Sequence, residues 1–193
     1  MAQAMNITLP PDIDRIWQRY ADTWKQVIMH PRTFFNEWDH NEAREQVIVF
    51  NIICGVLAGI IKTILTFGSA FSAIIVYPIL MLIGTLTGGA VLFLFFKLSG
   101  GEGDIEPTIK LVGYTQAVSV ISYGLPTVGP LLFFYQMILL TAVGTVYHKL
   151  DIRTSLFAVV IPIVLYMVLI ALIATILGVS FFGGILGHEG QVL

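Results

Sequence analysis

Three carboxylates alternate in a glycine-rich stretch, GGEGDIEP at residues 100–107: Glu102, Asp104 and Glu106. A glycine-rich loop cradles phosphate when a lysine and a hydroxyl group follow the glycines, but here acids follow, and they would repel phosphate. Several carboxylates can instead bind a hard cation such as calcium, although no EF-hand pattern surrounds these three. We therefore expect a structural loop, in which the glycines form the turn and Asp104 and Glu106 begin the next helix at its positive end. A cation-binding loop is the alternative.

The sequence offers little for catalysis. It has no serine–histidine pair, no HExxH motif and no pair of intramembrane acids, and its single cysteine, Cys54, allows no intrachain disulfide. Of the four histidines, His188 is expected on the opposite side of the membrane from the others, so they do not share a site. We predict no catalytic residues, no metal site and no cofactor, and hence no enzyme. An intramembrane lipid-modifying enzyme is the least favoured alternative.

The composition indicates an integral membrane protein. Apolar residues make up 56% of the chain, charged residues 11%, and the mean hydropathy is +0.86. Soluble domains carry about a quarter charged residues. The net charge of −2 is too small to argue for a nucleic-acid partner. The predicted fold class is an all-α polytopic membrane protein.

Five stretches are long and apolar enough to cross a bilayer, which takes about 20 residues at about 1.5 Å each. Their approximate bounds are 47–67, 70–96, 108–125, 129–147 and 155–179. The turn GLPTVGP at 124–130 separates the third from the fourth, because its glycines and prolines favour a tight reversal. We therefore predict a five-span domain at residues 47–180, preceded by a segment at 1–46 and followed by a short tail at 181–193.

The basic residues predict the orientation. They precede the first span and flank the loops near residues 97–110 and 149–153, but the loop near Gly68, the turn at 124–130 and the tail contain none. Cytoplasmic loops are enriched in lysine and arginine. We therefore expect the N-terminal segment in the cytoplasm and the tail on the external side. The start of the chain lacks the blocks of a signal peptide, so we expect the mature chain to keep it.

Residues 12–29 place apolar side chains at helical spacing and charged ones on the opposite face. This pattern predicts an amphipathic cytoplasmic helix, which either lies in the headgroup layer or packs on the ends of the bundle. His30-Pro31 should end it. Five aromatic residues are predicted to be interfacial anchors: Trp17, Trp24, Phe34, Phe35 and Trp38.

Polar residues within the spans are candidates for function, because their burial in hydrocarbon is costly. They are Asn51, Lys62, Gln116 and Gln136. Such groups commonly hydrogen-bond between helices, and Lys62 lies near the end of its span, where it can reach the interface. Small residues four apart permit close helix contact. The predicted helix-packing residues, between the first two spans or between two copies, are Gly55, Gly59, Gly84 and Gly88.

Four sequence segments, taken in their order and spacing, indicate a known family. They are PRTFF at 31–35, GGEGDIEPTIKLVGY at 100–114, LPTVGPL at 125–131 and HKLDIRTSLFAVVIPIVL at 148–165. Together they resemble the Yip-domain family, five-span membrane proteins named for interaction with Ypt/Rab GTPases, and within it the short prokaryotic members. The resemblance implies an all-helical bundle, a cytoplasmic N-terminus and no known enzymatic activity. We expect the chain in a prokaryotic inner membrane. The N-terminal region is short and the acidic motif of the eukaryotic relatives is not evident, so Rab binding is not carried over.

Two functions follow from these observations. The first is a non-catalytic membrane protein that binds or organises membrane lipids, other membrane proteins or copies of itself. The alternative is a small transporter or channel, or an accessory subunit of a transport complex, which would use the polar residues within the spans.

Overall fold

The computed structural model describes residues 11–39, 42–125 and 127–176, and within these ranges the chain forms helices and no strand. The all-α prediction is confirmed. The elements are α1 (Pro11–Met29), α2 (Pro31–Glu37), α3 (Arg44–Leu65), α4 (Ala73–Leu98), α5 (Ile105–Thr115), the short 3₁₀ helix η1 (Gln116–Val118), α6 (Ser119–Gly124), α7 (Gly129–Val146) and α8 (Ile152–Ile176).

Four of the described helices, α3, α4, α7 and α8, are long and apolar enough to cross a membrane. In place of the predicted third span, α5, η1 and α6 follow one another without a loop. At the 3₁₀ turn, Trp24 of α1 donates a hydrogen bond to the carbonyl oxygen of Ala117 at 2.9 Å. The carbonyl group of Ala117 thus binds a side chain of another helix at the point where the backbone hydrogen bonding changes from α-helical to 3₁₀. The count of five crossings stays a prediction, and the expected external tail at 181–193 lies outside the described residues.

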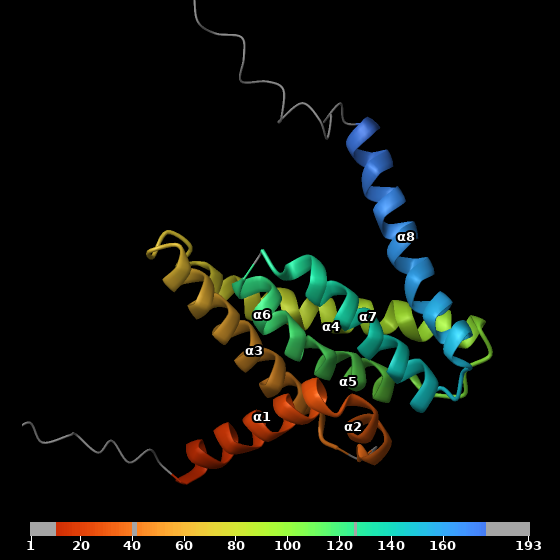
Figure 1. The fold of residues 1–193 in the computed structure, drawn as a ribbon, viewed down its shortest axis with the longest axis horizontal. Helices are drawn as coiled ribbons and strands as arrows, with labels where there is room; N and C mark the ends of the chain where they lie inside the picture. Colours follow the sequence, from red (N-terminus) through yellow and green to blue (C-terminus); the bar gives the residue numbers. More distant parts are fainter. Residues whose placement is uncertain (1–10, 40–41, 126, 177–193) are drawn as a thin grey trace, which may run out of the picture.

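The helices α3 to α7 pack side by side into one bundle, while α1 and α2 lie across one end of it and α8 projects away (Figure 1). The bundle core contains large side chains from several helices, among them Phe50, Met81, Phe96, Leu111 and Leu139. The first turns of α8 pack against α7 and α4. Beyond Ile163, most large apolar side chains of α8 are exposed. Such a helix is stable only in an apolar surrounding.

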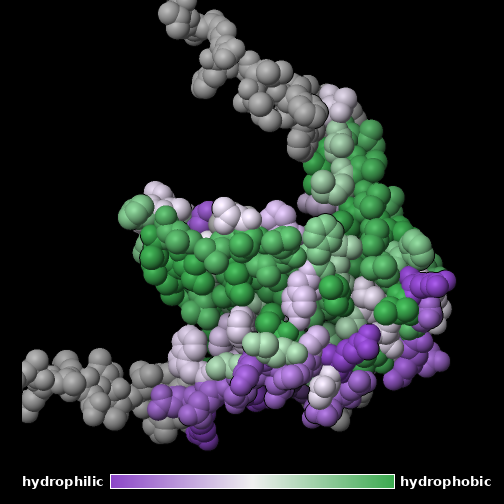
Figure 2. Space-filling view, in the orientation of Figure 1, coloured by the Kyte–Doolittle hydropathy of each residue, from purple (hydrophilic) through white to green (hydrophobic). Residues whose placement is uncertain are grey.

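Hydrophobic and hydrophilic residues occupy different parts of the surface (Figure 2). Hydrophilic residues cover α1, α2 and the loops beside them, whereas hydrophobic residues cover the bundle and α8. On α4, for example, Ile75, Ile83 and Leu94 are each more than half exposed. A soluble protein rarely exposes so large an apolar surface. The protein is therefore an integral membrane protein in which these side chains contact lipid.

Two of the predicted packing glycines bring α3 close to α4. A Cβ atom at Gly59 would lie 2.6 Å from the carbonyl oxygen of Ala73, and one at Gly55 would lie 2.9 Å from Cγ of Pro78 and closer still to its backbone. Real Cβ atoms do not approach so closely, so glycine is needed at both positions for this helix contact.

The two predicted glycines of α4 have more room. A Cβ at Gly84 would lie 3.9 Å from Nε2 of Gln116, which is an ordinary contact, and nothing lies within 4 Å of one at Gly88. The close approach on α4 occurs at Gly89, where a Cβ would lie 2.9 Å from Cα of Ile109. A packing role of Gly88 against another chain stays a prediction.

Candidate functional site

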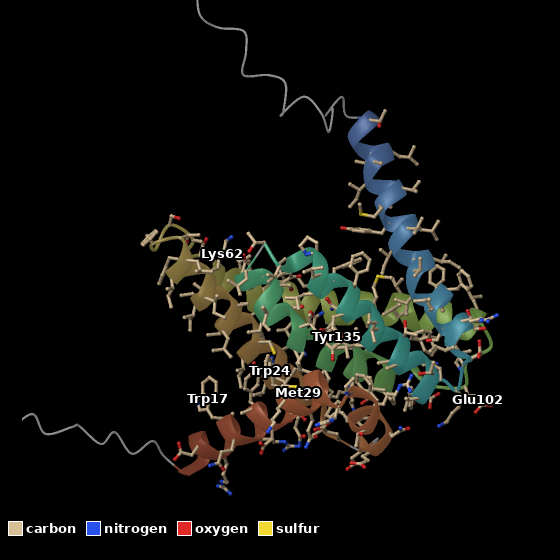
Figure 3. The ribbon with its side chains drawn as sticks, viewed as in Figure 1. Trp17, Trp24, Met29, Lys62, Glu102 and Tyr135 are labelled. Carbon is tan, nitrogen blue, oxygen red and sulfur yellow. The ribbon has the colours of Figure 1, made fainter. Side chains whose placement is uncertain are left out.

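We call residues 11–39 and 42–46, which include α1 and α2, the N-terminal cap. Buried contacts attach it to the bundle. Trp24 binds the carbonyl group of Ala117, and Tyr135 of α7 donates a hydrogen bond to the carbonyl oxygen of Ile28 at 2.6 Å. Both side chains are labelled in Figure 3. Between these contacts Val27 is fully buried. The second half of α1 is therefore fixed on the bundle.

Glu42 joins α1 to the rest of the cap, and the cap to α5, through three of its oxygen atoms. Its carboxylate accepts hydrogen bonds from Nη2 of Arg19 at 3.1 Å and from Nε1 of Trp38 at 2.6 Å. Its carbonyl oxygen accepts a hydrogen bond from Nζ of Lys110 at 2.7 Å. Nη2 of Arg19 also binds the side-chain oxygen of Gln46. Hydrogen bonds to charged groups are stronger than those between neutral groups, so Glu42 fixes the position of the cap.

A second charged group lies beside the first. Glu106, in the first turn of α5, accepts hydrogen bonds from Nε and Nη2 of Arg44 at 2.8 and 2.6 Å and lies 3.0 Å from Nζ of Lys110. The hydrogen bonds from Arg44, and then those from Lys110, lower the pKa of Glu106 to about 2. Lys110 is only 7% exposed. Its burial is tolerated because its ammonium group has two oxygen partners.

The five predicted aromatic anchors occupy different environments. Phe35 and Trp38 are buried, and Trp24 and Phe34 are half-buried against the core. Trp17 is 43% exposed and stands on the side of α1 that faces the bundle (Figure 3). Of the two alternatives for the N-terminal helix, packing on the bundle therefore describes the second half of α1. Insertion of its first half into the headgroup layer stays a prediction.

Two of the hollows that border the cap lie between α1 and the start of α3. A polar cavity of about 670 Å³ lies between α1, α2 and the start of α3. Its wall carries three aromatic and three acidic residues: Phe34, Trp38, Tyr114, Glu37, Asp39 and Glu42. A smaller groove of about 210 Å³ lies between α1 and α3, and we call it the α1–α3 groove. Both hollows are preformed concave surfaces of the kind that bind ligands or partners.

The glycine-rich loop covers two residues at the end of α7. Gly100 has a φ of +89°, which permits the reversal after α4. A Cβ at Gly101 would lie 3.0 Å from Nδ1 of His148, and one at Gly103 would lie 2.5 Å from Cε1 of Tyr147. The glycines therefore serve close packing as well as the turn. Asp104 precedes α5 and Glu106 lies in its first turn, as predicted.

His148 is fully buried under this loop. Its ring lies 4.6 Å from that of Phe96, and its Nε2 lies 2.8 Å from Oγ1 of Thr108. The hydroxyl of Thr108 donates its proton to the carbonyl oxygen of Asp104, so Nε2 must be the donor to Thr108. Nδ1 has no hydrogen-bond partner among the described residues. Burial, and next the charge of Lys97, lower the pKa of His148 to about 4, while Asp104 opposes this.

Among the described residues, no hydrogen bond joins the predicted polar residues of the spans to one another. Asn51 is fully buried, accepts a hydrogen bond from Thr85 of α4 at 2.9 Å and donates one to the carbonyl oxygen of Val47 at 2.8 Å. Ser119 donates a hydrogen bond to Oε1 of Gln116 at 2.6 Å. Asn51 therefore links α3 to α4, whereas the bond of Gln116 is local, between η1 and the start of α6.

Lys62 and Gln136 are half-buried. Lys62 lies in the last turn of α3, close to the end of the helix (Figure 3). This is the position from which a lysine reaches the interface. In the described part of the chain no group of three or more His, Cys, Asp or Glu residues is placed to hold a metal ion.

Sequence reasoning missed Glu42 and three glycines that pack closely, Gly89, Gly113 and Gly144. Glu42 has no periodic signal, because it lies in the chain before α3. Gly89 follows Gly88 directly, and the spacing of four residues from Gly84 assigned the packing role to Gly88. Gly144 of α7 packs tightly against Ser155 of α8, and the spacing of residues within either helix does not indicate this contact.

Comparison with known proteins places the chain in a family. Neither the search of curated proteins nor that of solved structures found a match. The family model of the Yip1 domain matches residues 25–175, which is more than half of the chain and includes part of α1 and all of α2 to α7. This family consists of non-enzymatic membrane proteins. The chain therefore belongs to the Yip1 domain family.

Proposed function

We propose that this protein is a non-catalytic membrane protein that binds another membrane protein through its N-terminal cap. The observation that carries the proposal is the polar cavity of about 670 Å³ in the cap. Glu42, through Lys110, and Trp24, through Ala117, attach the cap to the bundle. A surface that is already ordered loses less conformational entropy when a partner binds. Membership of a non-enzymatic family supports the absence of catalysis.

We further propose that residues 1–46 face the cytoplasm of a prokaryotic cell and that residues 181–193 lie outside it, with the five-span domain at 47–180 between them. The distribution of lysine and arginine supports this orientation. Single-cysteine variants at Thr33 and Gln191, made in a Cys54→Ala background, test it. In intact cells a membrane-impermeant thiol reagent should label position 191 and leave position 33 unlabelled. Labelling of position 33 alone would invert the topology.

Site-specific crosslinking tests partner binding. A photoreactive benzoylphenylalanine is placed at Thr33 or Glu37, two exposed positions that line the cavity. The matched control is Leu94, which is 53% exposed on the lipid-facing side of α4. In native membranes both cap positions should give the same discrete protein adduct, and Leu94 should not. The proposal fails if neither cap position gives a protein adduct, or if Leu94 gives the same one.

The transporter or channel alternative has no supporting observation of its own in the described residues. Asn51 and Gln116 form hydrogen bonds within the bundle, and Lys62 lies at the end of α3. Flux measurements in liposomes with the wild type and Lys62→Met address it directly. Flux that depends on Lys62 would favour transport over partner binding.

A further inference from the structure

The α1–α3 groove results from the way in which α1 leaves the bundle. The second half of α1 is attached through Trp24 and Val27, whereas its first half diverges from α3 (Figure 1). On this first half Ile16 and Trp17 are 47% and 43% exposed. Within the described residues, an exposed apolar surface on α1 therefore lies next to the groove, and hydrophobic residues cover the bundle beside it (Figure 2).

The lining of the groove changes from polar to apolar along α3. Glu45 and Gln46 lie in the first turn of α3, Val49 and Phe50 one turn further, and Ile53 a turn beyond. At about 1.5 Å per residue, Glu45 and Ile53 are about 12 Å apart along the helix. This gradient follows the change from headgroup to hydrocarbon in a bilayer leaflet. It matches a molecule with a polar head and an apolar chain.

The polar end of the groove carries opposite charges. Arg19 uses only Nη2 in its contacts with Glu42 and Gln46, its other nitrogen donors bind no residue in the described part of the chain, and its side chain is 60% exposed. A guanidinium group matches the geometry of a phosphate. Glu45 lines the same groove and is exposed, with no hydrogen-bond or ion-pair partner in the described ranges. A zwitterionic phosphodiester headgroup complements both charges.

We propose that the α1–α3 groove binds one zwitterionic phospholipid per chain. Its phosphate lies at Arg19, its ammonium group lies near Glu45, and one acyl chain lies along Val49 and Ile53. Lipid is the occupant because the groove is continuous with the lipid-facing surface of α3, where Ile48 and Val49 are 46% and 42% exposed. Water at this depth would leave the apolar wall unburied. The proposal does not rest on the partner-binding function of the cap, although the groove and the polar cavity share part of their lining.

Titration of the delipidated, full-length protein in detergent with a single phospholipid species, followed by native mass spectrometry, tests the headgroup assignment. Phosphatidylethanolamine should bind at one molecule per chain, and more tightly than phosphatidylglycerol with the same acyl chains. Arg19→Gln should weaken binding about tenfold or more, since a charge-assisted hydrogen bond is lost. Glu45→Gln should reverse the preference, so that phosphatidylglycerol binds at least as well. Lys25→Gln, which removes an exposed cation of α1 outside the groove, should change neither affinity.

A second pair of variants tests the apolar end without touching the charges. Val49→Trp fills the groove and should abolish retention of the lipid, whereas Ile83→Trp, on the exposed face of α4, should retain it. Arg19→Lys keeps the positive charge and should retain most of the affinity. If it does, the weaker binding of Arg19→Gln results from the lost charge and not from a disturbed cap.

Three results would overturn the proposal. The first is equal lipid retention in Val49→Trp and Ile83→Trp. The second is an unchanged headgroup preference in Glu45→Gln. The third is a groove occupied by protein: either a dimer that dissociates in Val49→Trp, or lipid binding that appears only after deletion of residues 1–10. The crosslinks from Thr33 and Glu37 should persist in Val49→Trp, so this test and that of partner binding fail separately.

Discussion

Acidification should destabilise the protein through His148, a residue that takes no part in either proposed interaction. Its ring is fully buried between the glycine-rich loop and Phe96, and its Nε2 already donates to Thr108. A proton on Nδ1 would therefore create a buried charged donor with no acceptor in the described structure. The groups that act on this proton are Lys97, which disfavours it, and Asp104, which favours it.

The size of the effect follows from the pKa. The pKa of His148 falls from 6.5 to about 4 on folding. Between these values the unfolded chain binds a proton that the folded protein does not, so stability decreases as the pH falls. The contribution is complete above about pH 6.5 and lost towards pH 4. At about 1.4 kcal/mol per pH unit, the loss is about 3 kcal/mol.

The measurement is reversible unfolding of the purified protein in mixed micelles, followed by tryptophan fluorescence at several pH values between 7.5 and 4. His148→Phe is the matched variant, because a phenyl ring keeps the contact with Phe96 and removes the ionisable group. It should lack the slope between pH 6.5 and 4. The pKa of Glu106 is lowered from 4.5 to about 2, so its own contribution begins to fall below about pH 4.5, but it falls equally in both proteins and cancels in the comparison.

Two outcomes would contradict this reasoning. If wild type and His148→Phe lose stability in parallel over this range, another group is responsible. If the wild type is equally stable at pH 6.5 and pH 4, the folded protein accepts the proton without cost. In that case the loop must supply Nδ1 with an acceptor on protonation, and His148 is not held as the structure shows.

Single substitutions elsewhere in the fold should change the stability or the local hydrogen exchange of the protein. Gly55→Ala should destabilise the protein by about 1–3 kcal/mol, because the new methyl group meets the backbone of α4. Gly88→Ala should be neutral or slightly stabilising in the same unfolding assay, and a loss as large as at Gly55 would indicate that another chain packs there. Thr85→Val should cost about 1–3 kcal/mol by that assay, since it leaves a buried asparagine oxygen without its donor. Trp24→Phe should speed hydrogen exchange of the amides of α1, because it removes the bond to η1, whereas Trp17→Phe should not.

The helices that are long and apolar were predictable because hydrocarbon imposes one simple requirement on them. Spans at 47–67, 70–96 and 129–147 correspond to α3, α4 and α7, with ends displaced by a few residues. The stretch at 108–125 did not form one helix. Hydropathy records only how apolar a segment is, and the interruption at η1 coincides with a hydrogen bond from Trp24, over 90 residues away in sequence.

The candidate site was less predictable, because its residues act across the fold. The structure has helix α1 over the stretch where the amphipathic pattern of residues 12–29 predicts one, while the interfacial placement of that helix stays a prediction. The pattern did not show that Trp24 binds the bundle while Trp17 stays exposed, since this depends on where α1 diverges from α3. Gly55 and Gly59 were predictable from their spacing within one helix. Glu42 was not, because its partners Arg19 and Lys110 come from distant segments.

Tyr114 is the point at which the two proposed interactions meet. It lines both the polar cavity and the α1–α3 groove, and its ring lies 5.1 Å from that of Phe34 in the cap and 5.1 Å from that of Phe50 in α3. Tyr114→Leu removes the ring that both hollows share, so the partner adduct from Thr33 and the affinity for phosphatidylethanolamine should decrease together. Val49→Trp, which fills only the groove, should affect the lipid alone. If Tyr114→Leu changes one interaction and spares the other, the two hollows are separate sites that merely share a wall. If both decrease, the ring contributes to both hollows, and the lipid and the partner can still bind without affecting each other, as the persistence of the crosslinks in Val49→Trp would indicate.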